Sequence, residues 1–297
     1  MERNHINVTT KESVFFLSYN STGFNVQRGD FITDVCNTFG NEKCFIAIQE
    51  HWLLGKNKSK INSFMSNDLV VFSIGAFKDH QQVRRGRGKA GLAQMWHQSY
   101  DHLVTRLSVP VTKRVQGVVV NFPSSKVLWI NAYLPCDPAV SDFDETELRQ
   151  TLTGISWLIQ NTDHDNIVLS GDINADFSRS PRFTGIVKEL INTHQLVTSW
   201  QTSHIDYTFK APGTDSFSVI DHFLCNKSMS TCIIESGVLH RGDNLSGHSP
   251  IFMKVETQKL EKKIAHHVNL FHGNLGKKLV IMKNNILKMI FKIGLMR

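Results

Sequence analysis

The chain has 297 residues, of which 41% are hydrophobic and 9% aromatic, a composition typical of a globular protein with a sizeable core. Its net charge of +7 comes from the end of the chain, because residues 259–297 hold nine Lys and Arg against Glu261, which leaves residues 1–258 at about −1. Overall charge therefore gives no support for nucleic-acid binding by residues 1–258, and a local basic patch would be needed.

Short apolar runs bounded by Gly, Pro, Asn, Asp or Ser recur along residues 1–258 and are typical of buried strands. Segments with helical spacing lie between some of them, and one of these carries acidic residues in its first turn. In chain order we expect strand 14–17, helix 31–39, strands 45–48, 69–74, 117–122 and 127–130, helix 145–160, strand 167–169, helix 183–194, and strands 219–225 and 250–255.

The alternation of these strands and helices predicts an α/β fold, in which two sheets form a sandwich with helices on the outer faces. We expect residues 1–258 to form this one domain. In residues 259–297, Lys recurs among Leu, Ile and Met, so we expect a basic tail that is either a helix or a partly disordered linker.

The five cysteines are scattered and form no Cys-x-x-Cys pair, so neither a zinc site nor a disulfide framework is predicted. No run of about 18 apolar residues occurs, and the first 12 residues lack an apolar signal segment. We therefore expect no membrane association and no secretion, and an intracellular compartment fits best.

The strongest candidate for chemistry is the apolar run at 167–169, which leads into Gly171, Asp172 and Asn174. Residues two apart on an extended chain face the same way, so we expect Asp172 and Asn174 to project together. A carboxylate and an amide could then hold and activate a water molecule. The same residues are also common in turns, where they bind backbone groups, and the sequence leaves both interpretations open.

Other apolar runs also stop at a polar side chain. Glu50 ends one of them, and a carboxylate there suits Mg²⁺, although a solvated strand end is equally consistent. Asn20 and Tyr133 end two others. Asp221 and His248 lie at later strand boundaries, where a buried Asp could fix the tautomer of a His and favour its charged form.

Taken in order, these motifs resemble the exonuclease/endonuclease/phosphatase superfamily over about residues 13–256, and within it the apurinic-endonuclease-like domain of non-LTR (LINE-type) retrotransposons. The motifs are Asn, Gln-Glu, Asn-x-Tyr-x-Pro, Gly-Asp-x-Asn, Ile-Asp-His and Ser-x-His-Ser-Pro-Ile. Lys89-Ala-Gly-Leu-Ala93 and Tyr207-Thr-Phe209 favour this subgroup. The resemblance implies a DNase I-like sandwich.

The resemblance also implies a Mg²⁺-dependent endonuclease, with Mn²⁺ as the other candidate ion, that nicks DNA and leaves a 3′-hydroxyl. A nuclear location is expected, and a reverse transcriptase domain outside this chain is a candidate partner. The implied roles are metal binding by Glu50 with help from Asn20, positioning and activation of water by Asp172 and Asn174, phosphate contact by Tyr133 and His248, orientation of His248 by Asp221, and substrate contact by Thr208.

The chain departs from this family at one position, because Ser246-Gly247-His248 stands where the family usually has Ser-Asp-His. Loss of that carboxylate is expected to weaken metal binding. Two alternatives therefore stay open, a weakened or dead nucleic-acid-binding remnant of a retroelement and another phosphodiesterase of the same fold. A gain of nicking in Gly247→Asp would favour a damaged enzyme over a binding module.

The candidate DNA-contacting patch is a cluster of basic residues among glycines, which could reach phosphates on either side of the cut. A mobile basic loop without a partner is the alternative. The cluster comprises Arg84, Arg85, Arg87 and Lys89.

Overall fold

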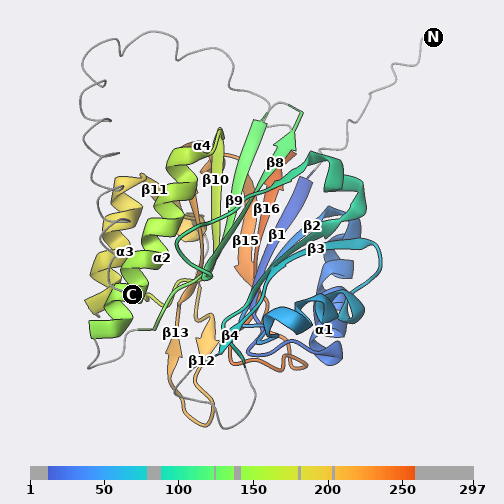
Figure 1. Cartoon of the computed structure of the whole chain (residues 1–297), viewed down its shortest axis with the longest axis horizontal. Helices are drawn as coiled ribbons and strands as arrows, with labels where there is room; N and C mark the ends of the chain where they lie inside the picture. The colour runs from blue at the N-terminus through green and yellow to red at the C-terminus, as the bar shows by residue number, and fades with distance from the viewer. Residues whose placement is uncertain are drawn as a thin grey trace, which may run out of the picture. The chain divides into compact units, whose positions relative to one another are not determined.

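The structure is a computed structural model, and it describes residues 13–78, 88–123, 125–136, 142–179, 182–202 and 205–257. Two six-stranded sheets, each with parallel and antiparallel pairs, face each other and carry helices on their outer sides (Figure 1). The predicted α/β sandwich is thus confirmed. The tail 259–297 lies outside the described residues, so the domain boundary at 258 stays a prediction.

The first sheet has the strand order β15-β16-β1-β2-β6-β3, with β1 and β2 running parallel. A cluster of apolar side chains packs α1 and the 3₁₀ segment η2 against its outer face. The elements are β1 (Ser13–Asn20), α1 (Val26–Phe39), β2 (Cys44–Gln49), η2 (Gly55–Phe64), β3 (Leu69–Ile74), β6 (Leu92–His97), β15 (Ile233–Val238) and β16 (Ile251–Glu256).

The second sheet has the order β11-β14-β10-β9-β8-β7, with β9 and β10 running parallel. Helices α2 and α3 pack against its outer face. The elements are β7 (Val104–Arg106), β8 (Val115–Phe122), β9 (Ser125–Tyr133), α2 (Asp142–Asn161), β10 (Asn166–Asp172), α3 (Arg182–Thr193), β11 (Leu196–Thr198) and β14 (Asp221–Asn226).

Two small hairpins and several short helical turns complete the described part of the chain. The hairpins are labelled at the lower end of Figure 1 and the turn α4 at the upper end. The elements are β4 (Phe77–Lys78) with β5 (Gly88–Lys89), β12 (Phe209–Lys210) with β13 (Phe217–Ser218), α4 (Lys227–Ser230), η1 (Asn41–Lys43), η4 (Gln98–Leu103) and η5 (Ser199–Thr202). None of the helices among the described residues is long and apolar enough to span a membrane.

The space between the sheets is filled mainly by aromatic and aliphatic side chains. Phe16 and Phe45 stack with ring centroids 5.4 Å apart, and Trp129 of the other sheet meets both edge-on. Polar contacts also cross this space, and in one of them Gln49 Nε2 donates to Asn131 Oδ1 at 2.8 Å. Asn131 Nδ2 in turn donates to backbone carbonyls of the first sheet.

Most of the predicted strands extend beyond their apolar runs, and four strands of the two six-stranded sheets were missed, as were the four short strands of the hairpins. The missed strands of the large sheets are β6, β7, β11 and β15. β6 contains the buried Gln94, which donates to the Trp129 carbonyl oxygen and interrupts the apolar pattern. β15 lies at the edge of its sheet and alternates poorly, because Ile234 and Glu235 are both exposed.

The extended strands bring several polar residues to one end of the sandwich. Asn20 pairs in register with Gln49 at the ends of β1 and β2, and Asp172 pairs with both Tyr133 and Asp221. Gly171 permits this pairing, because its φ is 142° and a Cβ there would lie 1.9 Å from the Ala132 carbonyl oxygen.

Candidate active site

Asn20, the last residue of β1, links the two sheets at this end. Its Nδ2 donates to Glu50 Oε1, just after β2 in the first sheet, and to Asp172 Oδ2, at the end of β10 in the second. Both distances are 2.9 Å. Asn20 Oδ1 accepts the backbone N–H of Thr22 at 3.1 Å. The structure therefore brings the residue expected to bind metal and the residue expected to activate water onto one amide.

Glu50 lies in a turn with left-handed backbone, since φ is 54° at Glu50 and 60° at Trp52. Glu50 Oε2 accepts the indole N–H of Trp52 at 3.0 Å, so both carboxylate oxygens are held. The Trp52 ring occupies space that only a glycine at position 23 leaves open, because a Cβ on Gly23 would lie 2.4 Å from it. Sequence reasoning missed Trp52, whose only signal is its place two residues after Glu50.

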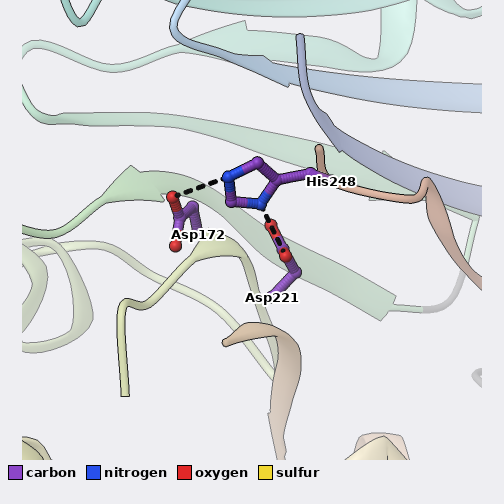
Figure 2. Close-up of side chains that lie close together, drawn as sticks. All are labelled: Asp172, Asp221 and His248. Atoms are coloured by element: carbon purple, nitrogen blue, oxygen red, sulfur yellow. Dashed lines mark hydrogen bonds and ion pairs between the residues drawn. The ribbon is translucent and has the colours of Figure 1, made fainter. Parts of the chain in front are cut away.

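His248 lies between two carboxylates of the second sheet (Figure 2). Its Nδ1 is 2.9 Å from Asp221 Oδ2, and its Nε2 is 3.9 Å from Asp172 Oδ2. All three side chains are buried. The pairing of Asp221 with His248 that the sequence suggested is therefore present, and Nε2 is too far from Asp172 for a hydrogen bond.

Burial and the charge of a neighbouring residue shift the pKa of His248, and that of Asp172, in opposite directions. Burial alone would lower the pKa of His248, but the charges of Asp221 and Asp172 and the hydrogen bond to Asp221 raise it to about 9. Burial is the main reason that the pKa of Asp172 is raised to about 7, partly offset by the charge of His248. Near neutral pH, His248 is a cation and Asp172 can accept a proton.

Thr208 holds the backbone at Asp221. Its Oγ1 accepts the backbone N–H groups of Ile220 and Asp221, both at 3.0 Å. The residue is 0% exposed and its hydroxyl accepts these two bonds, while the expected contact with substrate stays a prediction. The neighbouring Phe209 packs its ring on His248, with centroids 4.6 Å apart.

Asn174 does not lie on an extended strand, so the argument from strand alternation was wrong. β10 ends at Asp172, and Asn174 has a left-handed φ of 50°. Its backbone N–H donates to Asp172 Oδ1 at 3.1 Å and its Nδ2 to the Leu134 carbonyl oxygen at 2.8 Å. The turn chemistry that the sequence left open is therefore present, with the backbone N–H of Asn174 in contact with Asp172.

Tyr133 ends β9 next to Asp172 in register. Burial raises the pKa of its hydroxyl well above the usual value, and the charges of Glu50 and Asp172 add to this. The hydroxyl therefore stays protonated and can donate a hydrogen bond. The guanidinium of Arg114 lies over its ring, 4.8 Å from the centroid.

Gly247 provides space rather than an unusual backbone conformation. A Cβ there would lie 2.9 Å from the Lys210 carbonyl oxygen and 3.0 Å from the Phe209 ring. Lys210 N–H also donates to the Gly247 carbonyl oxygen at 2.9 Å. The loop before β16 is thus packed closely against the β12 hairpin where the related family usually has an aspartate.

The site offers oxygen donors that fit a magnesium ion. Glu50 and Asp172 present carboxylates joined through Asn20, and Mg²⁺ needs only one or two carboxylates besides water and phosphate. Asp172, Asp221 and His248 also place possible ligand atoms within 4.8 Å of one another. This second group fits less well, because the Nδ1 of His248 is bound to Asp221 and its raised pKa keeps the ring charged.

The predicted basic patch falls largely outside the described residues. Arg84, Arg85 and Arg87 are not among them, so their contact with DNA stays a prediction. Lys89 is described, and it pairs with Phe77 across the β4–β5 hairpin.

Sequence comparison gives no relative, since no family model and no curated protein matches the chain. Solved structures do match. The AP endonuclease LMAP from Leishmania major has a TM-score of 0.62 at 14% identity, over 82% of this chain and 88% of its own. The 3′-5′ exonuclease NExo from Neisseria meningitidis has 0.62 at 17%, over 82% and 100%.

The endonuclease domain of TRAS1, a telomere-specific non-LTR retrotransposon, has a TM-score of 0.59 at 14% identity, over 84% of this chain and 100% of its own. Identities this low show a common fold. The described part of the chain therefore shares the two-sheet α/β-sandwich fold of these solved structures, in agreement with the fold that the resemblance implied.

Proposed function

We propose that this chain is a Mg²⁺-dependent endonuclease that nicks DNA, of the type found in non-LTR retrotransposons. The observation that carries the proposal is the unbroken series of contacts from Glu50 through Asn20, Asp172 and His248 to Asp221. It places a proton acceptor and a buried cation beside carboxylates that suit a metal. The AP endonuclease, exonuclease and retrotransposon endonuclease among the similar structures support DNA as the substrate.

In this proposal, Glu50 and Asn20 hold Mg²⁺ with Asp172 close by, and the ion when bound neutralises charge that develops on the phosphate. Asp172 takes the proton of the attacking water, and the Oδ1 of Asn174 helps to orient that water. The Nε2–H of His248 and the hydroxyl of Tyr133 donate to phosphate oxygens.

The test is conversion of supercoiled plasmid to open circle by purified protein with Mg²⁺. Glu50→Ala and Asp172→Ala are each expected to reduce nicking at least about 100-fold, because each removes a group that acts on the reacting phosphate or water. Glu42→Ala is the matched control, since Glu42 is an exposed carboxylate in η1. Equal nicking by the wild type and both site variants would contradict the assignment of this site to an endonuclease.

Gly247 favours a second candidate, a nucleic-acid-binding remnant with little or no activity. The close packing at this glycine shows that the loop has no room for the missing carboxylate without a shift. Protein that binds a labelled duplex but opens no plasmid with Mg²⁺ or Mn²⁺ would support this candidate against the endonuclease.

Another phosphodiesterase activity on the same fold is the third candidate. Among the similar structures is a 3′ phosphatase NExo from Neisseria bound to a product DNA hairpin, with a TM-score of 0.61. Release of phosphate from a hairpin with a 3′-phosphate, without plasmid nicking, would favour this activity.

A further inference from the structure

A buried cation lies next to Tyr133 and outside the contacts that the proposed reaction uses. Arg114, just before β8, is only 2% exposed. A buried guanidinium is costly unless its charge is paired and its N–H groups are bound. Its partners should therefore show what holds it there.

Arg114 has two sets of contacts. Its Nε and Nη2 donate to the two carboxylate oxygens of Glu147 on α2, at 2.7 and 3.1 Å. The other set is made with Tyr133, because Nη1 donates to the Tyr133 carbonyl oxygen at 3.4 Å and the guanidinium carbon lies 4.8 Å from the ring centroid. The Tyr133 backbone N–H also donates to the Arg114 carbonyl oxygen at 3.0 Å.

The guanidinium carbon also lies 5.5 Å from the ring centroid of Phe77. Arg114 is thus fixed by the fork to Glu147 and by aromatic rings, while it contacts the backbone carbonyl and the ring of Tyr133. Lysine could replace the charge but neither the planar stack nor the two-pronged pairing.

We propose that Arg114 is the positioning residue for Tyr133, anchored on α2 by Glu147 and holding the phenol ring where its hydroxyl meets the scissile phosphate. The cation over the ring also makes the hydroxyl a stronger donor, because it opposes the negative charges of Glu50 and Asp172. The inference rests on the proposed function, since the contact of Tyr133 with phosphate belongs to it.

The first test is a double-mutant cycle on plasmid nicking. Arg114→Lys, which keeps the charge, is expected to lower kcat about tenfold, with KM and the Mg²⁺ requirement within about twofold of the wild type. In a Tyr133→Phe background the same substitution should change kcat less than about twofold, because the hydroxyl it positions is gone. An equal loss in both backgrounds would overturn the proposal in favour of a purely structural role.

The second test does not depend on activity. The chain has four tyrosines, so ¹⁹F spectra of protein labelled with 3-fluorotyrosine are simple, and Tyr133→Phe assigns the resonance of interest. Arg114→Met combined with Glu147→Met removes both charges together and is expected to shift the Tyr133 resonance while the other three stay in place. An unmoved Tyr133 resonance refutes the positioning role. If the wild type nicks no plasmid, the proposed function fails and these spectra alone decide the placement.

Discussion

His51, the residue after Glu50, is fixed by backbone groups rather than by charged partners. Its Nδ1 accepts the Leu53 N–H at 3.0 Å, and its Nε2 lies 2.9 Å from the Ile74 carbonyl oxygen. A Cβ on Gly91 would come within 2.5 Å of the ring. Since one nitrogen accepts and the other donates, the ring is neutral, and burial lowers its pKa to about 4.

Because of His51, we expect stability to fall in mild acid. The unfolded His has a pKa of about 6.5 and the folded one about 4, so the unfolded chain binds more protons between these values. The contribution of His51 to the free energy of unfolding is complete above pH 6.5 and is lost as the pH falls towards 4. The loss amounts to about 2 kcal/mol at pH 5. Urea unfolding at pH 7.5 and 5 measures the free energy of unfolding, and its decrease between the two pH values should be about 2 kcal/mol smaller in His51→Gln than in the wild type. An identical drop in both proteins would contradict this account.

At Gly247, we expect that restoring an aspartate will not simply repair the site. A Cβ must displace the Lys210 backbone or the Phe209 ring, so Gly247→Ala and Gly247→Asp should each cost about 1–2 kcal/mol. Thermal denaturation should then show a lower Tm for both, by several degrees. A large gain of nicking in Gly247→Asp with unchanged Tm would show that the loop relaxes freely.

The turn after β2 shows how an element places a functional side chain. Two left-handed residues, Glu50 and Trp52, fold the chain back so that the indole N–H reaches the carboxylate. Gly23, in the loop after β1, leaves room for the indole. Glu50 is therefore held by residues from the ends of two parallel strands.

Trp52→Phe should weaken the use of Mg²⁺ if Glu50 is the metal ligand. The variant keeps an aromatic ring but lacks the N–H that fixes one carboxylate oxygen, and loss of such support typically costs about tenfold in metal affinity. The measurement is the Mg²⁺ concentration that gives half-maximal plasmid nicking. Trp157→Phe, on α2 with 37% of its surface exposed, is the control. An unchanged Mg²⁺ requirement in Trp52→Phe would argue against this role.

At the scale of the whole sandwich, the two apolar sheet faces are also joined by polar contacts, and a group of them lies near the site. Asn131 on the second sheet donates to the Ile48 and Ala93 carbonyl oxygens of the first and accepts from Gln49. These bonds lie beside the last residues of β2, one position before Glu50. They set the position of one sheet relative to the other where both supply site residues.

Asn131→Ala should therefore lower the free energy of unfolding more than the loss of one polar side chain usually does. It removes one of the two acceptors of the buried Gln49 amide, which keeps Ser18 Oγ at 3.0 Å, and one donor to each of two buried carbonyl groups, at a cost of about 3 kcal/mol. Urea unfolding measures this, with Asn121→Ala as the control, because Asn121 is half-exposed and its side chain donates to Leu103 of η4 and Thr105 of β7, within its own sheet layer. A loss no larger than in the control would mean that the sheets are positioned by apolar packing alone.

The sequence predicted which polar residues lie at strand ends better than it predicted which of these residues lie close together. Polar residues that stop apolar runs identified Asn20, Glu50 and Asp172, since the change from apolar to polar is local. Their meeting on one amide could not be predicted, because Asn20 and Asp172 come from different sheets and lie 152 positions apart. The burial of Thr208 and the left-handed φ of Asn174 could not be predicted either, because both depend on tertiary packing.

Asn20 has two side-chain hydrogens, and both are used on carboxylates. The planar amide fixes the angle between these two bonds, so the spacing of Glu50 and Asp172 follows the shape of one functional group. Asn20 therefore sets the distance between a carboxylate of the first sheet and one of the second. A small slide of one sheet over the other would strain the bond from Asn20 to Asp172, which joins the sheets, and would change the spacing in which a metal ion and a phosphate oxygen would have to fit.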